Sequence, residues 1–176
     1  LTPFLCDAVT NSTGSQAMLE RLERGNLFVL PLDERRQQYR YHRLFSDLLV
    51  HRLQIERSHK DITELHQRAG TWYEQHGELE QAIEHFLAGE NVSHAADLVE
   101  RTARTSLNVG RITSLLRWIE RLPSELLDIR PGLRFYQGWA LFLSGQFENA
   151  VRVLERTDLL LAKHEANTSL RGELNT

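Results

Sequence analysis

Residues 39–49 read YRYHRLFSDLL, and this stretch decides how the first part of the chain folds. The first three residues alternate in the manner of a β-strand, and apolar residues then recur at helical spacing from Leu44 to Leu53. His42 lies at the junction between the two patterns. The stretch therefore predicts a strand that leads directly into an amphipathic helix.

The residues before this stretch complete a small module. Residues 27–30, LFVL, predict an earlier strand, and the polar residues 33–38 predict the loop that joins the two strands into a hairpin. Residues 1–10 predict the end of a helix, and a second helix is expected to be capped by Ser15 and to end at residues 25–26, Gly-Asn. Helices, a hairpin and a closing helix in this order predict a winged helix over residues 1–58.

A two-stranded hairpin is not stable alone, so it must pack against the helices of the module. Apolar side chains from the hairpin and its neighbouring helices are therefore expected to form a shared core. The expected core residues are Leu22, Phe28, Leu30, Leu44 and Leu48.

Residues 59–176 show helical patterns only, and they contain an internal repeat. GTWY at residues 70–73 is matched by GWAL at residues 138–141, an offset of 68 residues. This offset is twice the 34-residue period of tetratricopeptide repeats. A degenerate copy lies between the two, and the turn glycines of the three copies are Gly77, Gly110 and Gly145. The region is therefore predicted to be an α-solenoid of tetratricopeptide-like helical hairpins.

Each position that recurs in the repeat has an expected physical role. Gly70 and Gly138 are expected to let two helices approach closely, and the turn glycines to adopt positive φ. Ala82 and Ala150 fit a tight helix crossing, while larger residues fill the space between hairpins. The polar end of the chain predicts that further repeats follow residue 176.

The composition indicates a globular chain with 41% apolar and 26% charged residues and a net charge of −3. No apolar run reaches the roughly 20 residues that span a bilayer, and no signal peptide is evident. Cys6 is the only cysteine, which favours a reducing, cytoplasmic setting. The chain starts without methionine, which suggests a piece of a longer protein. Residues 1–60 carry nine basic and seven acidic residues, a balance that does not require nucleic acid.

Five phrases in this order resemble the middle of the MalT-like, LuxR-type large ATP-binding transcriptional regulators, which belong to the signal-transducing ATPases called STAND proteins. The phrases are LTPFLCDAVT at residues 1–10, MLERLERGNLF at 18–28, YRYHRLFSDLL at 39–49, LRWIERLP at 116–123 and GWAL at 138–141. Together they cover the chain from its beginning to the second clear repeat.

The resemblance implies a multidomain switch in which this chain is the central signal-coupling segment. An ATPase domain would precede residue 1, and further repeats and a DNA-binding helix-turn-helix would follow residue 176. An inducer, either a small molecule or a protein, would bind the repeats and favour an ATP-bound, self-associating form that recruits RNA polymerase. The chain lacks the Gly-x-x-x-x-Gly-Lys-Ser/Thr loop, so ATP and ADP are expected only in the intact parent.

The resemblance also assigns a role to His42, because STAND proteins place a sensor histidine before the last helix of the winged-helix module. His42 would donate a hydrogen bond to the β-phosphate of ADP and hold the closed state. Arg43 stands where the sensor phrase has an acidic residue, and it is a second candidate for nucleotide contact. The alternative is a histidine at the start of a helix, satisfied by the local backbone.

The remaining candidates are less specific. Four arginines make the hairpin basic, which fits either DNA phosphates or a solvated edge, and the nearby Asp33 and Glu34 favour the solvated edge. The eight histidines and Cys6 show no metal-ligand spacing or catalytic signature, so neither a metal nor an enzyme is expected. Tyr136 and Trp139 are the candidates for a ligand or partner surface on the repeats.

Two other classes of function stay open. The repeats could form an interaction scaffold, with a peptide groove lined by Asn, Lys and Arg on the first helix of each hairpin. The winged helix could instead bind DNA directly, with the helical region as a dimerisation arm.

Overall fold

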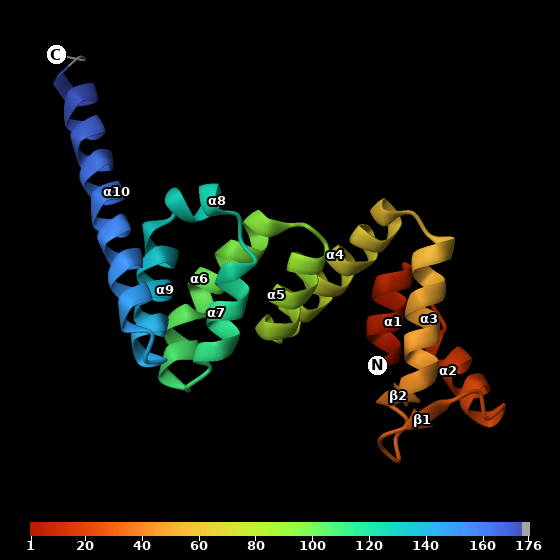
Figure 1. The fold of residues 1–176 in the computed structure, drawn as a ribbon. Helices are drawn as coiled ribbons and strands as arrows, with labels where there is room; N and C mark the ends of the chain where they lie inside the picture. The colour runs from red at the N-terminus through yellow and green to blue at the C-terminus, as the bar shows by residue number, and fades with distance from the viewer. Residues whose placement is uncertain (174–176) are drawn as a thin grey trace. The chain divides into compact units, whose positions relative to one another are not determined.

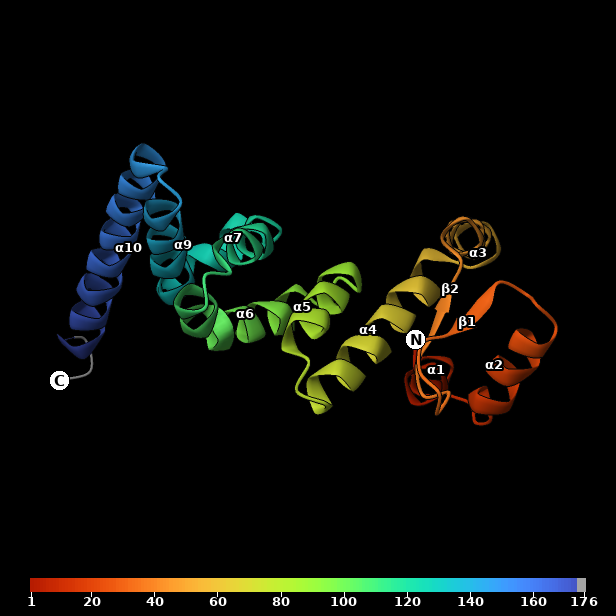
Figure 2. The same ribbon diagram turned by 90° about the horizontal axis from the view of Figure 1, so that it is seen from below.

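The computed structural model describes the backbone of residues 1–173 and the side chains of residues 1–162. The chain forms two compact units, Leu1–Asn91 and Val92–Thr176. Helices dominate both units, and the described strands form a single antiparallel pair in the first (Figures 1 and 2). The predicted fold class, mainly α with a winged helix and helical hairpins, is confirmed.

The first unit contains the winged helix and one helical hairpin. Its elements are α1 (Pro3–Thr10), α2 (Ser15–Arg24), β1 (Val29–Pro31), β2 (Tyr39–Tyr41), α3 (Arg43–Glu56), α4 (His59–Gln75) and α5 (Leu79–Ala88). The α4 helix begins with a capping box, in which the Ser58 hydroxyl accepts from Asp61 N and the Asp61 carboxylate accepts from Ser58 N. This cap explains why α3 and α4 are separate helices.

The link between α1 and α2 corrects the expected cap. Ser15 is the first residue of α2, and the residue before it, Gly14, has a positive φ of 92° and no capping side chain. The Ser15 N–H instead donates to Asp7 Oδ1 at 3.0 Å, so the acceptor comes from α1. Hydrogen bonding from the Ser15 side chain, together with this bond from its backbone, lowers the pKa of the Asp7 carboxyl. A local motif could not identify it, because the partners lie eight residues apart.

The register of the hairpin determines which side chains enter the core. Val29 pairs with Tyr41 and Leu30 pairs with Arg40. Partners in an antiparallel pair point to the same face, so Leu30 shares the solvent face with Arg40. Val29 shares the inner face with Tyr39 and Tyr41, and Leu19 of α2 packs against them.

The prediction of the core is therefore wrong for most of its residues. Phe28, Leu30, Leu44 and Leu48 are exposed, and only Leu22 is partly buried. Phe28 has a positive φ of 59°, so it precedes the regular alternation that starts at Val29. Leu44 and Leu48 are exposed on α3, a helix that buries none of its residues.

The first helical hairpin, α4 and α5, confirms the expected roles of the repeat residues. A Cβ on Gly70 would lie 3.0 Å from the Phe86 ring, so glycine permits the close crossing of the two helices. Gly77 makes the turn with φ of 76°, and Ala82 is fully buried. Because α4 also packs against α1, the compact unit extends to Asn91. The domain division at residues 58 and 59 stays a prediction about sequence modules.

The second unit consists of helices. They are α6 (Val92–Asn108), α7 (Ile112–Glu120), α8 (Ser124–Asp128), α9 (Pro131–Leu143) and α10 (Phe147–Glu173). Gly110 and Gly145 make the turns of hairpins α6/α7 and α9/α10, with φ of 76° and 80°. A Cβ on Gly138 would meet the Leu154 side chain at 2.6 Å. The α9 helix packs against both α6 and α7, so the two hairpins share a core.

An ion cluster joins three helices of this unit. Both carboxylate oxygens of Asp128 in α8 are used, one accepting from Arg134 Nη2 at 2.7 Å and the other from Arg156 Nη2 at 2.6 Å. Arg134 is only 8% exposed, and these arginines hold the pKa of the Asp128 carboxyl below its usual value. The cluster therefore fixes α8 against α9 and α10.

Candidate functional site

The structure places His42 between β2 and α3, where the backbone is tightly held. The His42 N–H donates to the Phe28 carbonyl at 2.8 Å, and the His42 carbonyl accepts from Ser46 N at 2.9 Å. The imidazole is exposed and makes no capping hydrogen bond. Its ring centroid lies 6.4 Å from that of Phe28. The sequence therefore positions an accessible imidazole on a fixed backbone.

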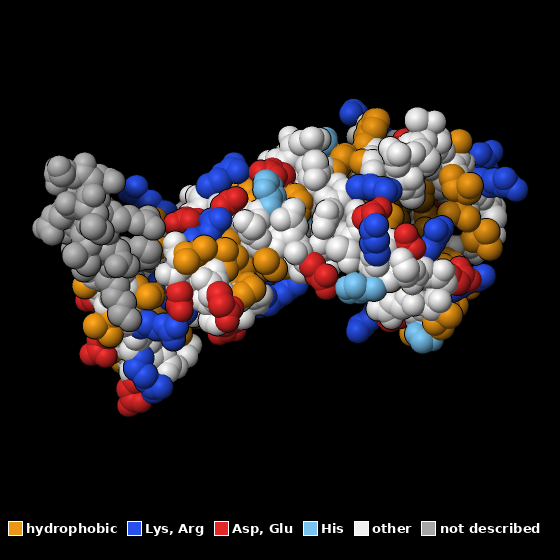
Figure 3. Space-filling model, turned by 90° about the horizontal axis from the view of Figure 1, so that it is seen from above, with side chains coloured by type: hydrophobic (Ala, Val, Ile, Leu, Met, Phe, Trp, Pro, Cys, Tyr) orange, Lys and Arg blue, Asp and Glu red, His pale blue; other side chains and the backbone are white. Residues whose placement is uncertain are grey.

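Exposed apolar side chains surround this junction. We define the wing–α3 surface by the exposed residues of the first strand region and of α3: Phe28, Leu30, His42, Arg43, Leu44 and Leu48. Below it, the Phe45 ring lies 5.1 Å from Phe28 and 5.8 Å from Tyr41. Figure 3 shows hydrophobic side chains gathered at the surface over the winged-helix part of the first unit, with basic side chains among them. Such patches commonly mark interfaces.

The basic residues of the hairpin are partly used within the module. Arg36 forms an ion pair with Glu23 of α2, with 3.0 Å between Nε and Oε2, and the Glu23 hydrogen bond raises the pKa of the Arg36 guanidinium. Asp33 Oδ1 accepts from the backbone N–H groups of Gln37 and Gln38 and so shapes the loop. The charged loop therefore has a structural role, as the solvated-edge interpretation expects.

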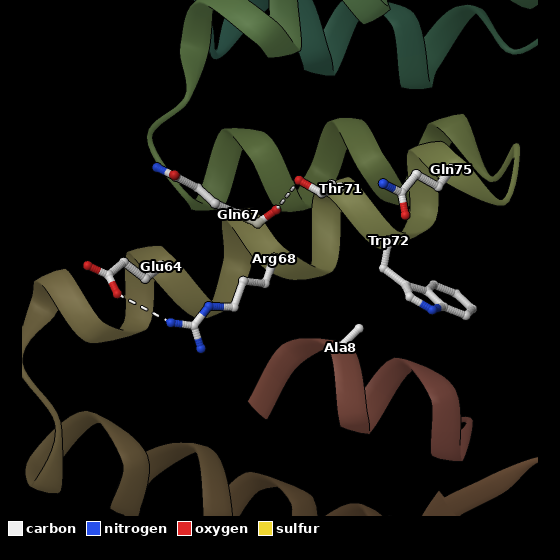
Figure 4. A pocket seen from close by; sticks show the side chains of 7 residues that line it. All are labelled: Ala8, Glu64, Gln67, Arg68, Thr71, Trp72 and Gln75. Carbon is white, nitrogen blue, oxygen red and sulfur yellow. Dashed lines mark hydrogen bonds and ion pairs between the residues drawn. The ribbon is translucent and has the colours of Figure 1, made fainter. Parts of the chain in front are cut away.

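A groove that the sequence did not indicate lies along α4 beside α1. Its volume is about 510 Å³, and Figure 4 shows Ala8 of α1 facing a row of α4 side chains across it. The row comprises Glu64, Gln67, Arg68, Thr71, Trp72 and Gln75. The sequence does show polar residues on successive turns of α4. That face becomes a groove only because α1 packs beside it.

The side chains of the groove are well held. Arg68 donates to the Val9 carbonyl at 3.1 Å and pairs with Glu64 at 3.5 Å. The Trp72 ring stacks on His76, with 3.8 Å between centroids. The groove thus presents amide, hydroxyl and aromatic groups, while its arginine is already engaged.

The two aromatic candidates on α9 occupy different surroundings. Tyr136 lines a cleft of about 500 Å³ with Glu100, Leu154 and Thr157, and Trp139 is not among the residues of that cleft. Trp139 is 45% exposed, and its ring lies between those of Phe135 and Phe142. The structure therefore does not bring Tyr136 and Trp139 together in one site, and their roles stay predictions.

The part of the chain with described side chains shows no catalytic or metal constellation. Among these residues, no group of three His, Cys, Asp or Glu side chains could hold a metal ion. Burial raises the pKa of the Cys6 thiol, which favours the unreactive protonated form. His66 and His85 lie together although they are far apart in sequence, a pairing that histidine spacing did not reveal. His164 lies outside the described side chains.

The fold and surfaces define a winged-helix module followed by helical hairpins, with an exposed apolar face and a histidine at the strand–helix junction. Residues 1–63 match the family model of the MalT winged helix domain. The prediction of a MalT-like segment from the five phrases is confirmed.

The relatives of the chain are much longer proteins. The chain is 31% identical over 170 residues to the serine/threonine-protein kinase PknK of Mycobacterium tuberculosis H37Rv. The aligned residues cover 97% of this chain and 15% of that kinase. The chain is 29% identical over 167 residues to the HTH-type transcriptional regulator MalT of Cronobacter sakazakii, covering 95% of this chain and 18% of that protein. The chain therefore spans 15–18% of the length of these relatives.

No solved structure matches the chain significantly. None of the described helices combines the length and apolar character needed to cross a lipid bilayer.

Proposed function

We propose that this chain is the central signal-coupling segment of a larger, cytoplasmic bacterial regulatory protein with an ATPase domain outside the chain. Inducer or partner binding on the helical hairpins would change how the winged helix contacts that ATPase domain. The contact would in turn bias the domain between its ADP-bound and ATP-bound states. The segment itself carries no catalytic step.

The observation that carries the proposal is the wing–α3 surface. Leu44 is 74% exposed and Leu48 is 57% exposed on a helix that buries none of its residues. Burial of apolar surface contributes about 25 cal/mol per Å², so a helix with these side chains is stabilised when another surface covers it. The ATPase domain is the proposed cover, and it would bring nucleotide close to His42 and Arg43.

The two kinds of relative support a coupling role over an output role. By their names, one is a protein kinase and the other is a transcriptional regulator, yet both match nearly the whole of this chain. A segment shared by a kinase and a transcriptional regulator is best explained if it acts before phosphorylation or DNA binding, in the step that senses the signal. DNA and RNA polymerase would then be contacted by other parts of the parent, and self-association would follow activation.

The role proposed for His42 follows from its exposure and position. An imidazole N–H can donate to a phosphate oxygen, and a charged acceptor makes this bond stronger than a neutral one. The hydrogen bonds of the His42 backbone would limit the loss of conformational entropy when the imidazole binds. Arg43 begins α3 one residue later and would add positive charge beside the same phosphate.

The test uses the intact protein that contains this chain. His42→Ala should weaken ADP retention at least ~10-fold, as expected for the loss of a hydrogen bond to a charged group, and should raise inducer-independent output. ADP would be measured by chromatography after the purified protein is denatured. His51→Ala is the matched control, because His51 is an exposed histidine on α3, the helix that directly follows His42. Unchanged ADP retention in His42→Ala would remove this residue from the mechanism.

A peptide-binding scaffold is the second candidate, and the position of the groove along α4 favours it, although the groove has no Asn or Lys in its lining and its one arginine, Arg68, is engaged by Val9 and Glu64. The groove lies on the first helix of a hairpin, and it offers Gln67, Thr71 and Gln75 with the Trp72 ring. Selection from a phage library of random dodecapeptides tests this candidate. Sequences that bind the chain but not its Trp72→Ala variant would support it, and no enrichment would count against it.

Direct DNA binding has less support from the surfaces. The α3 helix presents Leu44 and Leu48 to solvent, and Arg36 is paired with Glu23. Phosphate contacts need available cations, and they make binding strongly dependent on salt. Binding of duplex DNA at 50 mM salt that disappears at 200 mM would revive this alternative.

A further inference from the structure

Four aromatic side chains form a continuous row on the hairpin α9/α10. Phe135, Trp139 and Phe142 follow one another along α9, and Phe147 begins α10. Neighbouring ring centroids along the row are 6.4, 5.9 and 5.4 Å apart. Each of these side chains is between 45% and 58% exposed. We call the four residues the aromatic row, and the two helices that carry it lie side by side (Figure 1).

The aromatic row lies in a stretch of sequence without charge. Residues 135–147 contain no Asp, Glu, Lys or Arg, although 26% of the residues in the chain are charged. A surface helix normally places charged and polar side chains on the face that meets water. An uncharged face with four half-exposed rings therefore favours contact with another apolar surface.

The other hairpins show that the repeat itself does not require aromatic residues on this face. The matching residues follow from the offset of 68 between Gly70 and Gly138 and the offset of 35 between Gly110 and Gly145. The counterparts of Phe135, Trp139 and Leu143 are all polar or charged: Gln67, Thr71 and Gln75 in α4, and Glu100, Arg104 and Asn108 in α6. The aromatic residues of α9 are therefore not explained by the packing that the hairpins share.

The row leads into a cleft with acidic residues. Phe135 also lines the cleft of about 500 Å³ that contains Tyr136. The charged residues in the lining of this cleft are Glu100 of α6 and Asp158 of α10. Glu100 lies 3.6 Å from Arg130, which offsets part of its charge, while Asp158 is exposed to solvent. A molecule that follows the row therefore meets rings along α9 and negative charge at the Phe135 end.

The chemistry of the row favours a helix as the bound segment. An extended peptide would place unpaired backbone N–H and C=O groups against rings that offer few hydrogen bonds, whereas a helix pairs these groups internally. Side chains at i and i+4 of a helix lie about 6 Å apart along its axis. The ring separations of 5.4–6.4 Å match this spacing, so apolar side chains of a second helix fit between the rings.

The area of the row disfavours a second copy of this chain as its cover. Four half-exposed rings offer about 400 Å², taking about 200 Å² for a whole ring. Two copies that met through the row alone would bury about 800 Å² in total, less than the roughly 1,000 Å² expected of a specific interface. A separate helix can cover the row and also reach into the acidic cleft.

We propose that the aromatic row docks the apolar face of an amphipathic helix from a partner protein, with a Lys or Arg of that helix at Asp158. The partner is defined by apolar residues at i, i+3, i+4 and i+7 spacing and by a basic residue at one end of the apolar face. The inference deepens the proposed function, which assumes partner binding on the hairpins as the signal. Docking is measurable on the chain alone, so it can fail without affecting the role proposed for His42.

The probe is a synthetic peptide of about 14 residues, made of leucine and lysine with leucine at helical spacing. One control peptide replaces every lysine with glutamate, and the other scrambles the sequence so that the apolar face is lost. Fluorescence anisotropy should give a dissociation constant of about 10–100 μM for the lysine helix. Both controls should bind at least ~10-fold more weakly. Equal binding of the scrambled peptide, or no binding of the lysine helix, would overturn the proposal.

The three tryptophans report where the peptide binds, because they occupy different surroundings. Trp139 belongs to the aromatic row, Trp72 lines the groove along α4, and Trp118 is buried in α7. In the ¹⁵N-labelled chain, the lysine helix should shift the indole N–H resonance of Trp139 and leave the other two in place. A shift of Trp72 without a shift of Trp139 would place the peptide in the α4 groove and overturn the proposal.

The matching residues of α4 provide the variant. Phe135→Gln combined with Trp139→Thr gives α9 the residues that α4 carries at these positions, so the hairpin is expected to fold. Circular dichroism would check this. The double variant should bind the lysine helix at least ~10-fold more weakly, because it removes two central anchors. Asp158→Asn should weaken binding by about two- to fivefold, as expected for one exposed ion pair. Unchanged binding by the folded double variant would overturn the proposal.

Two further measurements address other surfaces and other occupants. Leu44→Gln alters the wing–α3 surface and should bind the lysine helix normally. Loss of binding in Leu44→Gln, with normal binding in the double variant, would move the docking site to the wing–α3 surface. Sedimentation of the chain without peptide should show no dimer that depends on the row. A dimer that the double variant abolishes would instead assign the row to a second copy and overturn the proposal.

Discussion

The α3 and α7 helices are both amphipathic, but their surroundings differ. The nine residues of α7 bury Leu115, Leu116, Trp118 and Ile119. The fourteen residues of α3 bury none. The α7 helix packs against both α6 and α9, whereas α3 packs more sparsely, against α4 and against the aromatic side chains at the hairpin. The difference indicates that the repeats are closed by their own chain, while the winged helix presents a face that another surface can cover.

The largest expected effect is at Trp118, which is fully buried in α7. Trp118→Ala should lower the free energy of unfolding by about 3–5 kcal/mol, because it removes a large side chain and leaves a cavity. Urea unfolding followed by circular dichroism would measure this loss. A change below about 1 kcal/mol would contradict the closed core of the second unit.

The close crossing of α9 and α10 gives the next effect. Gly138→Ala should cost about 1–3 kcal/mol, because the new Cβ would meet Leu154. The double variant with Leu154→Ala should show a positive coupling, since the clash is removed with its partner. Additive losses in urea unfolding would mean that the glycine is not required for this contact.

The Asp128 cluster should give a smaller effect that depends on pH. Asp128→Asn should cost about 1–2 kcal/mol, because Arg134 is buried and loses its charged acceptor. The folded pKa of Asp128 is lowered, so its contribution is present above the usual aspartate pKa of about 3.9 and is lost as pH falls toward the folded value. Unfolding from pH 7 to pH 2.5 should therefore show a smaller loss of stability in the variant than in the parent chain.

The smallest effect is expected on α3. Leu48→Ala should change the free energy of unfolding of the isolated chain by less than about 0.5 kcal/mol, because Leu48 is exposed. The same substitution in the intact protein should weaken ADP retention if the ATPase domain covers α3. A large loss of stability in the isolated chain would show that α3 is packed within the module, and the contrast with α7 would fail.

The repeat positions were predictable because their roles are local. A glycine at a tight crossing, a glycine with positive φ at a turn and a large residue nine positions later all act within one hairpin of about 34 residues. The middle copy keeps the geometry with Ala103 and Ile119, both fully buried. The residues that differ in the middle copy make the repeat harder to recognise in the sequence, but the matching positions are still buried.

The winged-helix core was harder to predict because apolar residues occur on both faces of the hairpin. A shift of one residue in the start of a strand moves every side chain to the opposite face. Phe28 and Leu30 were expected inside, but the positive φ of Phe28 starts the alternation at Val29. The apolar spacing of α3 predicted a helix and could not show whether this chain supplies the surface that covers it.

The candidate sites also divide into one that local sequence identifies and others that only the tertiary structure brings together. His42 was identified because its phrase and its position at a strand–helix junction are local, although its role is a proposal. The His66–His85 pair, the groove along α4 and the Asp128 cluster combine residues that are far apart in sequence or on different helices. Histidine spacing gave no signal for the pair, because the partners are 19 residues apart on two antiparallel helices.

The sequence by itself determined the helices, the hairpin, the turn glycines and the repeat period, since backbone conformation and side-chain periodicity depend on neighbouring residues. Tertiary structure alone decided which face of the hairpin is buried, that α3 remains exposed, and that α1 packs against α4. It also placed two histidines within hydrogen-bonding distance beside an apolar cavity. These outcomes depend on contacts between distant segments, whose free energies local patterns do not contain.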